Sequence, residues 1–275
     1  MAQGDLTRIR ANIAALNALN SLKNINKDVG VRQLRLATGK RLNSAADDPA
    51  GLTLAKRLDA RSRSLGQALA NIGDAENLLA VAEGGANNIQ SLVVQMREKI
   101  IQAANDTLGS TERAAIQQQL QEIGAEIDDA TRQTTWNNVV LLTNQMFTFQ
   151  VGAEGTDTIN FNVGSTLLSA TLGLNLLCVA NQASSAAALA SVDAALSSVS
   201  TLLQQIGAKM QRLGVKEQTV ATAVTNVEAA RSRIEDADMA REQLESTKLQ
   251  ILQQTATAML AQANVAPQAI LGLFR

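Results

Sequence analysis

The stretch "SVDAALSSVSTLLQQIGAKMQRL" (residues 191–213) repeats its apolar side chains every three or four residues. The repeating positions are Val192, Leu196, Val199, Leu203, Ile206, Met210 and Leu213. This spacing keeps one face of an α-helix apolar along its whole length, as in the seam of a coiled coil or a long bundle. The stretch therefore predicts a long helix packed side by side with others.

The same alternation of steps occurs in two earlier segments. Its members are Leu79, Ala82, Ala86, Ile89, Val93, Met96 and Ile100 in the first, and Ile116, Leu120, Ile123, Ile127 and Ala130 in the second. Between them and residue 191 the period changes to two, because Phe147, Phe149 and Val151 alternate with polar residues, and Ile159 and Phe161 do so again after "GAEGTD". This pattern predicts a β-hairpin at about residues 146–163. The expected fold is mainly α: a long antiparallel helical rod, like a coiled-coil bundle, with two helices out, a small β-hairpin cap and one helix back.

The composition argues against catalysis. The 275 residues carry a net charge of −1, with 46% hydrophobic and only 2% aromatic residues, a mix that favours helices packed through aliphatic side chains. Balanced charge gives no case for nucleic-acid binding. There is no histidine, and the one cysteine, Cys178, lies in an apolar context where we expect a buried structural thiol. We expect no enzyme, no catalytic or metal-binding residues and no cofactor.

The two ends of the chain also carry helical stripes. Near the start these are Leu6, Ile9, Ile13 and Leu16, and near the end Leu249, Leu252, Ala256, Met259 and Ala263. If the middle runs out and back, both ends meet, and the two stripes are expected to face each other in a second small bundle. Residues 249–274 contain no charged side chain but many glutamines, too polar for a transmembrane helix, so we expect no membrane insertion.

These patterns predict a discontinuous terminal-helix domain (residues 1–40 and 236–275) and a helical domain (residues 41–235). The segment "RLNSAADDPAG" (41–51) would form the joint between them, with Asp48 capping a helix that begins at Pro49. Further joint residues are Asn43 and Asp47 in this segment, and Glu235 and Asp236 on the return path.

Four segments together resemble bacterial flagellin. They are "LATGKRLNSAADDPAGL" (36–52), "TTWNNVVLL" (134–142), "ARSRIEDADMA" (230–240) and "ILQQTATAMLAQANVAPQAILGLFR" (251–275). The resemblance covers roughly the first 140 and last 90 residues, and its short centre is similar to a minimal flagellin without the variable outer domains.

The resemblance implies a structural subunit that self-polymerises, as a homopolymer of many copies, into the filament of the bacterial flagellum and serves motility. It implies extracellular localisation, type III export without a cleaved signal peptide, and contacts with an export chaperone, a filament cap and hook-junction proteins. The polymerisation interface expected from it comprises Ile9, Ile13, Leu16, Leu252, Ala256, Met259, Leu260 and Ala263.

One surface departs from the family pattern. Flagellins recognised by the vertebrate flagellin-sensing Toll-like receptor carry an Arg- and Leu-bearing surface on the helix that contains residues 93–106. Here Arg97 and Glu98 resemble the family, but Gln95 replaces an Arg, Lys99 a Leu, and Gln119 a Glu on the next helix. The resemblance therefore implies poor receptor binding, because a large Arg anchor and its charge partner are missing.

Two other functions stay open on the sequence. A hook–filament junction adaptor has ends that resemble those of flagellin, although the match of the final residues favours the filament protein. A membrane-active helical protein would need a strongly basic polar face or long apolar hairpins, and the sequence has neither.

Overall fold

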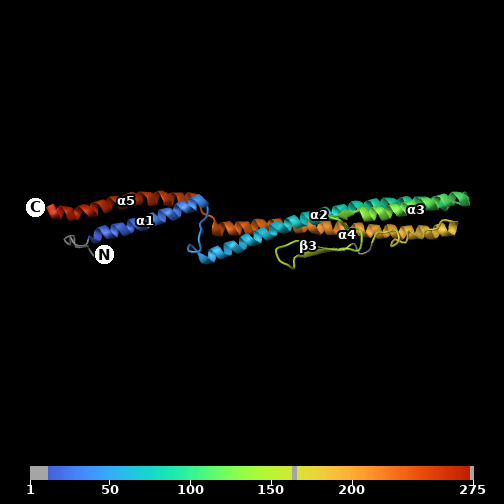
Figure 1. Ribbon diagram of the computed structural model, residues 1–275, viewed down its shortest axis with the longest axis horizontal. Helices are drawn as coiled ribbons and strands as arrows, with labels where there is room; N and C mark the ends of the chain where they lie inside the picture. Colours follow the sequence, from blue (N-terminus) through green and yellow to red (C-terminus); the bar gives the residue numbers. More distant parts are fainter. Residues whose placement is uncertain (1–11, 163–165, 273–275) are drawn as a thin grey trace. The chain divides into compact units, whose positions relative to one another are not determined.

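The computed structural model describes residues 12–162 and 166–272, and it is mainly α-helical as predicted (Figure 1). Its helices are α1 (Ile13–Thr38), α2 (Pro49–Ala103), α3 (Ser110–Gln133), α4 (Gln182–Glu235) and α5 (Met239–Gly272). Its strands are β1 (Thr135–Trp136), β2 (Val139–Val140), β3 (Met146–Gln150) and β4 (Thr158–Asn162). The chain divides into two compact units, the first from Met1–Ala60 and Asn226–Arg275, the second from Arg61–Thr225.

The second unit is built around α2, α3 and α4. Both α3 and α4 run antiparallel to α2, so the prediction of two helices out and one back was wrong: one helix runs out and two run back. All seven predicted seam residues of α2, from Leu79 to Ile100, are completely buried. On α4 the buried set includes Val192, Val199, Ile206 and Leu213 as expected. It also includes Ala195 and Leu202, while their neighbours Leu196 and Leu203 are only half-buried. The buried stripe of α4 is therefore centred about one residue away from the predicted one.

Gly85 lets the end of α3 approach α2 closely. A Cβ on Gly85 would overlap the side chain of Thr134, whereas a Cβ on Gly124 would make an ordinary contact, 4.0 Å from Cε of Met96. A glycine in the middle of a helix costs stability relative to alanine, so Gly85 has a packing reason to be there. Nothing lies within 4 Å of a Cβ built on Gly84.

The predicted β-hairpin is confirmed. Strands β3 and β4 pair antiparallel with Phe147 opposite Phe161 and Phe149 opposite Ile159. Ile159 and Phe161 are buried, so this face of the hairpin closes the core of its unit. A second, smaller hairpin joins β1 to β2 through Asn137 and Asn138, both with positive φ (47° and 63°). Two such residues are typical of a type I′ turn, and the adjacent asparagines were the signal for it in the sequence.

The segment between β4 and α4 is held against α3. Gln117 donates to the carbonyl of Leu177 (2.7 Å) and accepts from the backbone N–H of Val179 (3.0 Å). Leu177 and Val179 are buried, so Cys178 between them points outward and is exposed. The prediction of a buried cysteine was wrong because it rested on apolar neighbours, which here alternate between inside and outside.

The first unit contains the pair formed by α1 and α5, which lie side by side (Figure 1). Asn12 caps the start of α1 by accepting from the backbone N–H of Ala15, and its side-chain amide donates to the carbonyl of Ala263 on α5 (2.7 Å). Gly39, with φ of 69°, ends α1 in the left-handed conformation that favours glycine. The same unit holds the first turns of α2 and the last turns of α4.

Candidate assembly site: the terminal helix pair and its joint

The seam between α1 and α5 follows a seven-residue repeat on both helices. On α1 the less exposed positions are Ala15, Ala18, Leu22, Ile25, Val29, Arg32 and Leu36, and on α5 they are Glu242, Ser246, Leu249, Gln253, Ala256, Leu260 and Ala263. Steps of three and four keep each set on one helix face. Among these side chains only Val29 and Ala256 are buried hydrophobics, and the larger apolar side chains Leu22, Ile25, Leu36, Leu249 and Leu260 are half-buried, so the two helices leave the seam partly open to water.

This seam differs from the predicted one on α5. The stripe expected to face the N-terminal helix included Leu252 and Met259, but these side chains are 41% and 63% exposed. Gln253 and Leu260, one residue further on, occupy the seam instead, and the amide of Gln253 donates to Asn26 across it (2.8 Å). Both stripes have helical spacing, so spacing alone could not separate them.

The outer face of the pair is apolar over much of its length. On α5, Leu244, Ile251, Ala258 and Val265 recur every seven residues opposite the seam, with Leu252 and Met259 beside them, and all six are exposed. On α1, Ile13, Leu16, Leu19 and Leu34 are likewise exposed. We call these ten residues, which lie on the outward sides of the two helices, the outer apolar face. Large exposed apolar patches mark interaction surfaces in folded proteins.

The predicted interface residues fall on both sides of the pair. Ile13, Leu16, Leu252 and Met259 belong to the outer apolar face. Ala256, Leu260 and Ala263 lie in the seam within the subunit. The eighth residue, Ile9, lies outside the described residues. Contact with other copies stays a prediction for all eight.

The two connections of the joint pair with each other through their backbones. The N–H of Arg41 donates to the carbonyl of Glu235 (2.7 Å), and the N–H of Ala237 donates to the carbonyl of Gly39 (2.9 Å). Around this short antiparallel pairing, Lys40 forms an ion pair with the buried carboxylate of Glu235. Leu42, 4% exposed, closes the loop against the start of α2.

The loop that leads into α2 is fixed by its two aspartates. Asp47 accepts from the backbone N–H groups of Ser44 (2.9 Å) and Asn43 (3.1 Å), and these bonds hold the pKa of its carboxyl below the ordinary range. Asp48 accepts from the N–H of Gly51 (2.9 Å) and caps α2, which begins at Pro49 as expected. Asn43 donates its side-chain amide to the carbonyl of Lys40 (3.1 Å). Asp236 contributes its backbone to the joint, through the bridge that pairs it with Lys40.

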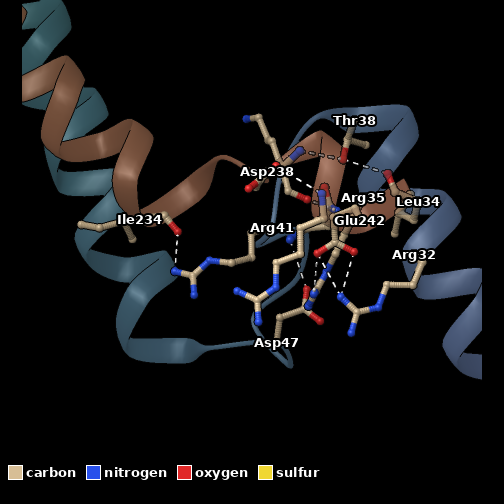
Figure 2. A network of polar contacts seen from close by, with 12 residues as sticks. Arg32, Leu34, Arg35, Thr38, Arg41, Asp47, Ile234, Asp238 and Glu242 are labelled. Atoms are coloured by element: carbon tan, nitrogen blue, oxygen red, sulfur yellow. Dashed lines mark hydrogen bonds and ion pairs between the residues drawn. The ribbon is translucent and has the colours of Figure 1, made fainter. Parts of the chain in front are cut away.

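A buried carboxylate that the sequence analysis missed lies next to the joint. Glu242 accepts two hydrogen bonds from Arg32 (3.0 and 2.8 Å) and lies 3.5 Å from Nη1 of Arg35, as Figure 2 shows. Its side chain is only 9% exposed. In the same view Arg41 donates to the carbonyl of Ile234 (2.7 Å). The signal in the sequence was a charge at a seam position on each helix, Arg32 on α1 and Glu242 on α5.

Further along the return path, Arg231 on α4 pairs with Asp59 on α2 and with Glu228 on its own helix. This ion pair ties the last turns of α4 to the first turns of α2. Within residues 12–162 and 166–272, no group of three or more histidine, cysteine or carboxylate side chains is placed to hold a metal ion. The charged groups of the joint thus form ion pairs that link its helices.

The residues of the predicted receptor surface separate into two sets. Gln95 and Lys99 are one turn apart on the same face of α2, and Lys99 lines a shallow groove with Gln119 of α3. Arg97 points elsewhere and pairs with Asp193 of α4 (2.8 Å). Gln95, Lys99 and Gln119 therefore share one surface, and Arg97 belongs to another.

Among the described helices, α4 alone is long and apolar enough by composition to cross a membrane, with a mean hydropathy of 1.5 over its most apolar 18 residues. Its buried residues, among them Val192, Val199 and Ile206, fill the core of the second unit. Of its most apolar window 28% is buried within the unit, and one helix of this composition is weak evidence for a membrane span.

Comparison with known proteins identifies the relatives of this chain. Residues 9–146 match the family model of the bacterial flagellin N-terminal helical region, and residues 189–274 match that of the C-terminal helical region. The chain is 35% identical over 271 residues to the flagellin of Halalkalibacterium halodurans, a match that covers 97% of this chain and 99% of the relative.

Two solved structures share the fold. The crystal structure of Bacillus cereus flagellin matches with a TM-score of 0.50 and 23% identity, over 59% of this chain and 94% of that one. A putative flagellar hook-associated protein from Vibrio parahaemolyticus matches with a TM-score of 0.57 and 15% identity, over 69% of this chain and all of the other. At these identities the likeness concerns the fold alone.

Proposed function

The chain belongs to the bacterial flagellin family and is a structural subunit of the extracellular flagellar filament, and from this premise we propose that the outer apolar face of the α1–α5 pair is the surface through which copies polymerise. The junction-adaptor alternative is not favoured, because both terminal family models and a relative matched over nearly its whole length are flagellins.

The observation that carries the proposal is the exposed seven-residue repeat on α5. Its side chains include Leu244 and Ile251, which are 65% and 58% exposed. Fully burying one side chain of this size is worth about 1.5–3 kcal/mol. A repeat of seven residues favours another helix lying lengthwise along it, and neighbouring copies of the same pair would supply such helices.

The small seam supports a further part of the proposal. Most apolar side chains of the seam are only half-buried, so α1 and α5 alone form a weak core for a helix pair in water. We expect both helices to be largely unfolded in the free subunit and to become ordered on assembly. The neutral amides of α5, such as Gln253, suit an interface from which water is excluded on assembly, because they avoid the desolvation cost of a buried charge.

The other proposals follow from the family. Residues 1–40 and 236–275 would form the inner domain of the filament and residues 41–235 the outer one, with the paired connections at Lys40 and Asp236 as the joint. Export through the type III apparatus without a cleaved signal, and contacts with a chaperone, a cap and hook-junction proteins, would serve delivery and growth.

Seeded polymerisation tests the interface. Met259→Asp places a charge on the outer apolar face without touching the seam, and Met259→Leu is its matched control. We expect Met259→Asp to raise the critical monomer concentration at least about 30-fold, since a charge would be left unpaired in an apolar contact. Met259→Leu should polymerise like the parent chain. Normal filament growth by both Met259→Asp and Ile251→Asp would exclude the outer apolar face as the interface.

We also propose that this chain is poorly recognised by the flagellin-sensing Toll-like receptor. Positions 95 and 119 of this surface carry glutamines in place of the Arg anchor and its Glu partner, although Glu122 lines the same groove. A reporter-cell assay should show weak activation by the parent chain and a clear increase for the triple variant Gln95→Arg, Lys99→Leu, Gln119→Glu. Strong activation by the parent chain would contradict the proposal.

A further inference from the structure

The second unit carries an acidic stripe on α3. Its members, Glu122, Glu126 and Asp129, are exposed and follow steps of four and three residues, so they lie in a row on one helix face. In the part of the chain that the structure describes, none of them forms an ion pair. Two cations lie near these three carboxylates: Lys99 borders the same groove as Glu122, and Arg132 follows Asp129 by one turn. Two cations do not balance three carboxylates, so the stripe keeps a net negative charge.

A basic stripe of the same length runs along α4. Lys209, Arg212 and Lys216 follow steps of three and four residues and are exposed or half-exposed. Within the described residues these cations also lack ion-pair partners. Arg212 and Lys216 line a groove between α4 and the β3–β4 hairpin. The carboxylate of Asp157 lines it too, but packs against Gly152 in its own turn.

The contacts within the unit fix the positions of the two stripes along the helix axes relative to each other. Asp193 of α4 lies beside Arg97 of α2, and Ser200 lies beside Gln90. Residue numbers therefore rise along α4 as they fall along α2, by one residue for each residue. Gly124 of α3 and Thr134, the residue that caps its end, lie beside Met96 and Gly85 in the same way. Helices α3 and α4 therefore run in the same direction, antiparallel to α2.

These pairings give each residue of α3 and α4 a position along α2. The acidic stripe lies level with residues 91–98 of α2, and the basic stripe lies level with residues 74–81. The shift is roughly 17 residues, or about 25 Å at 1.5 Å per residue. This exceeds two Debye lengths at physiological salt, so the two stripes of one chain do not neutralise each other.

We propose that the acidic stripe of one copy binds the basic stripe of a neighbouring copy, in parallel orientation and shifted by about 25 Å along the helices. This single shift brings Glu122 level with Lys209 and Asp129 level with Lys216. The contact joins two different surfaces, and repeating such a contact builds a ring or a helical filament instead of a closed dimer. The proposal rests on the assignment of the chain as a filament subunit and adds which outer surfaces meet between copies.

The test is a charge swap in seeded polymerisation. One triple variant reverses the acidic stripe (Glu122→Lys, Glu126→Lys, Asp129→Lys), and the other reverses the basic stripe (Lys209→Glu, Arg212→Glu, Lys216→Glu). Each alone sets like charges against each other and should raise the critical concentration at least about tenfold at low salt. An equimolar mixture of the two triple variants, and the sixfold variant with both stripes reversed, restore opposite charges at every contact and should polymerise close to the parent level.

A third triple variant controls for charge alone. It reverses Glu98, Glu154 and Glu217 to Lys, which are exposed on the same unit but outside both stripes, and it should assemble like the parent chain. Circular dichroism of each monomer checks that the fold is kept. The proposal is overturned if the stripe variants assemble as well as the control, if the control fails equally, or if neither the mixture nor the sixfold variant recovers. Each of these outcomes leaves polymerisation by the parent chain intact, whereas a parent chain that forms no filament would refute the proposed function itself.

Discussion

Replacing Gly85 by alanine should destabilise the second unit, while the same change at Gly84 should stabilise it. Both glycines lie inside α2, one residue apart. A Cβ on Gly85 would overlap Oγ1 of Thr134, lie 2.6 Å from its Cγ2 and lie 3.0 Å from its Cβ. The Cβ of Thr134 cannot move by rotation of its side chain, so the end of α3 has to shift. A Cβ on Gly84 meets nothing within 4 Å.

The magnitudes follow from three contributions. Exchanging a mid-helix glycine for alanine gains about 1 kcal/mol at either position. At Gly85 this gain is offset by overpacking of about 1–3 kcal/mol. Rotating Thr134 away would also break the bond from its hydroxyl to the carbonyl of Ala130 (2.7 Å), worth about 1 kcal/mol. The gain from alanine cancels between the two variants, so we expect Gly85→Ala to be about 2–4 kcal/mol less stable than Gly84→Ala.

Urea unfolding of the monomer, followed by far-UV circular dichroism, measures the difference. Adding Thr134→Ala removes Oγ1 and Cγ2, and the double variant with Gly85→Ala should recover much of the loss. If Gly85→Ala proves as stable as Gly84→Ala, the close approach of α2 and α3 at this point is not real.

Two further outcomes are expected at the joint. Glu242→Gln leaves Arg32 and Arg35 with a neutral partner. It should raise the critical concentration of polymerisation about tenfold or more, because disrupting a largely buried ion pair costs more than about 1.4 kcal/mol. The control Glu245→Gln loses only a pair with the exposed Lys248 and should change the critical concentration less than about threefold. The pKa of Asp47 is lowered by its backbone hydrogen bonds, so its contribution to loop order is complete above the unfolded value of about 3.9 and is lost as the pH falls through the lower, folded value. The NMR amide signal of Ser44 should follow that titration, and a signal that titrates at or above the ordinary aspartate value would contradict it.

Local patterns predicted the fold because each rested on one dominant interaction. The predicted seam of α2 was correct because its seven apolar residues face a core on one side of the helix only. Asp48 and Pro49 predicted a helix start, and alternation around "GAEGTD" predicted a hairpin, in which the structure sets Phe149 opposite Ile159.

The candidate site was harder to predict because α5 is apolar on two faces. Leu252 and Gln253 both fit a helical repeat, and which of them faces α1 depends on the partner helix. Glu242 was missed for a related reason, since a carboxylate in a seam is stable only with the cation that the other helix supplies. Contacts between elements distant in the sequence decided both cases.

A filament structure determined by electron microscopy, grown by seeding the purified chain, tests the central claim most directly. We predict that Leu244, Ile251 and Met259 are covered by helices of neighbouring copies. If these side chains instead face solvent in the assembled filament, the outer apolar face is not the polymerisation interface.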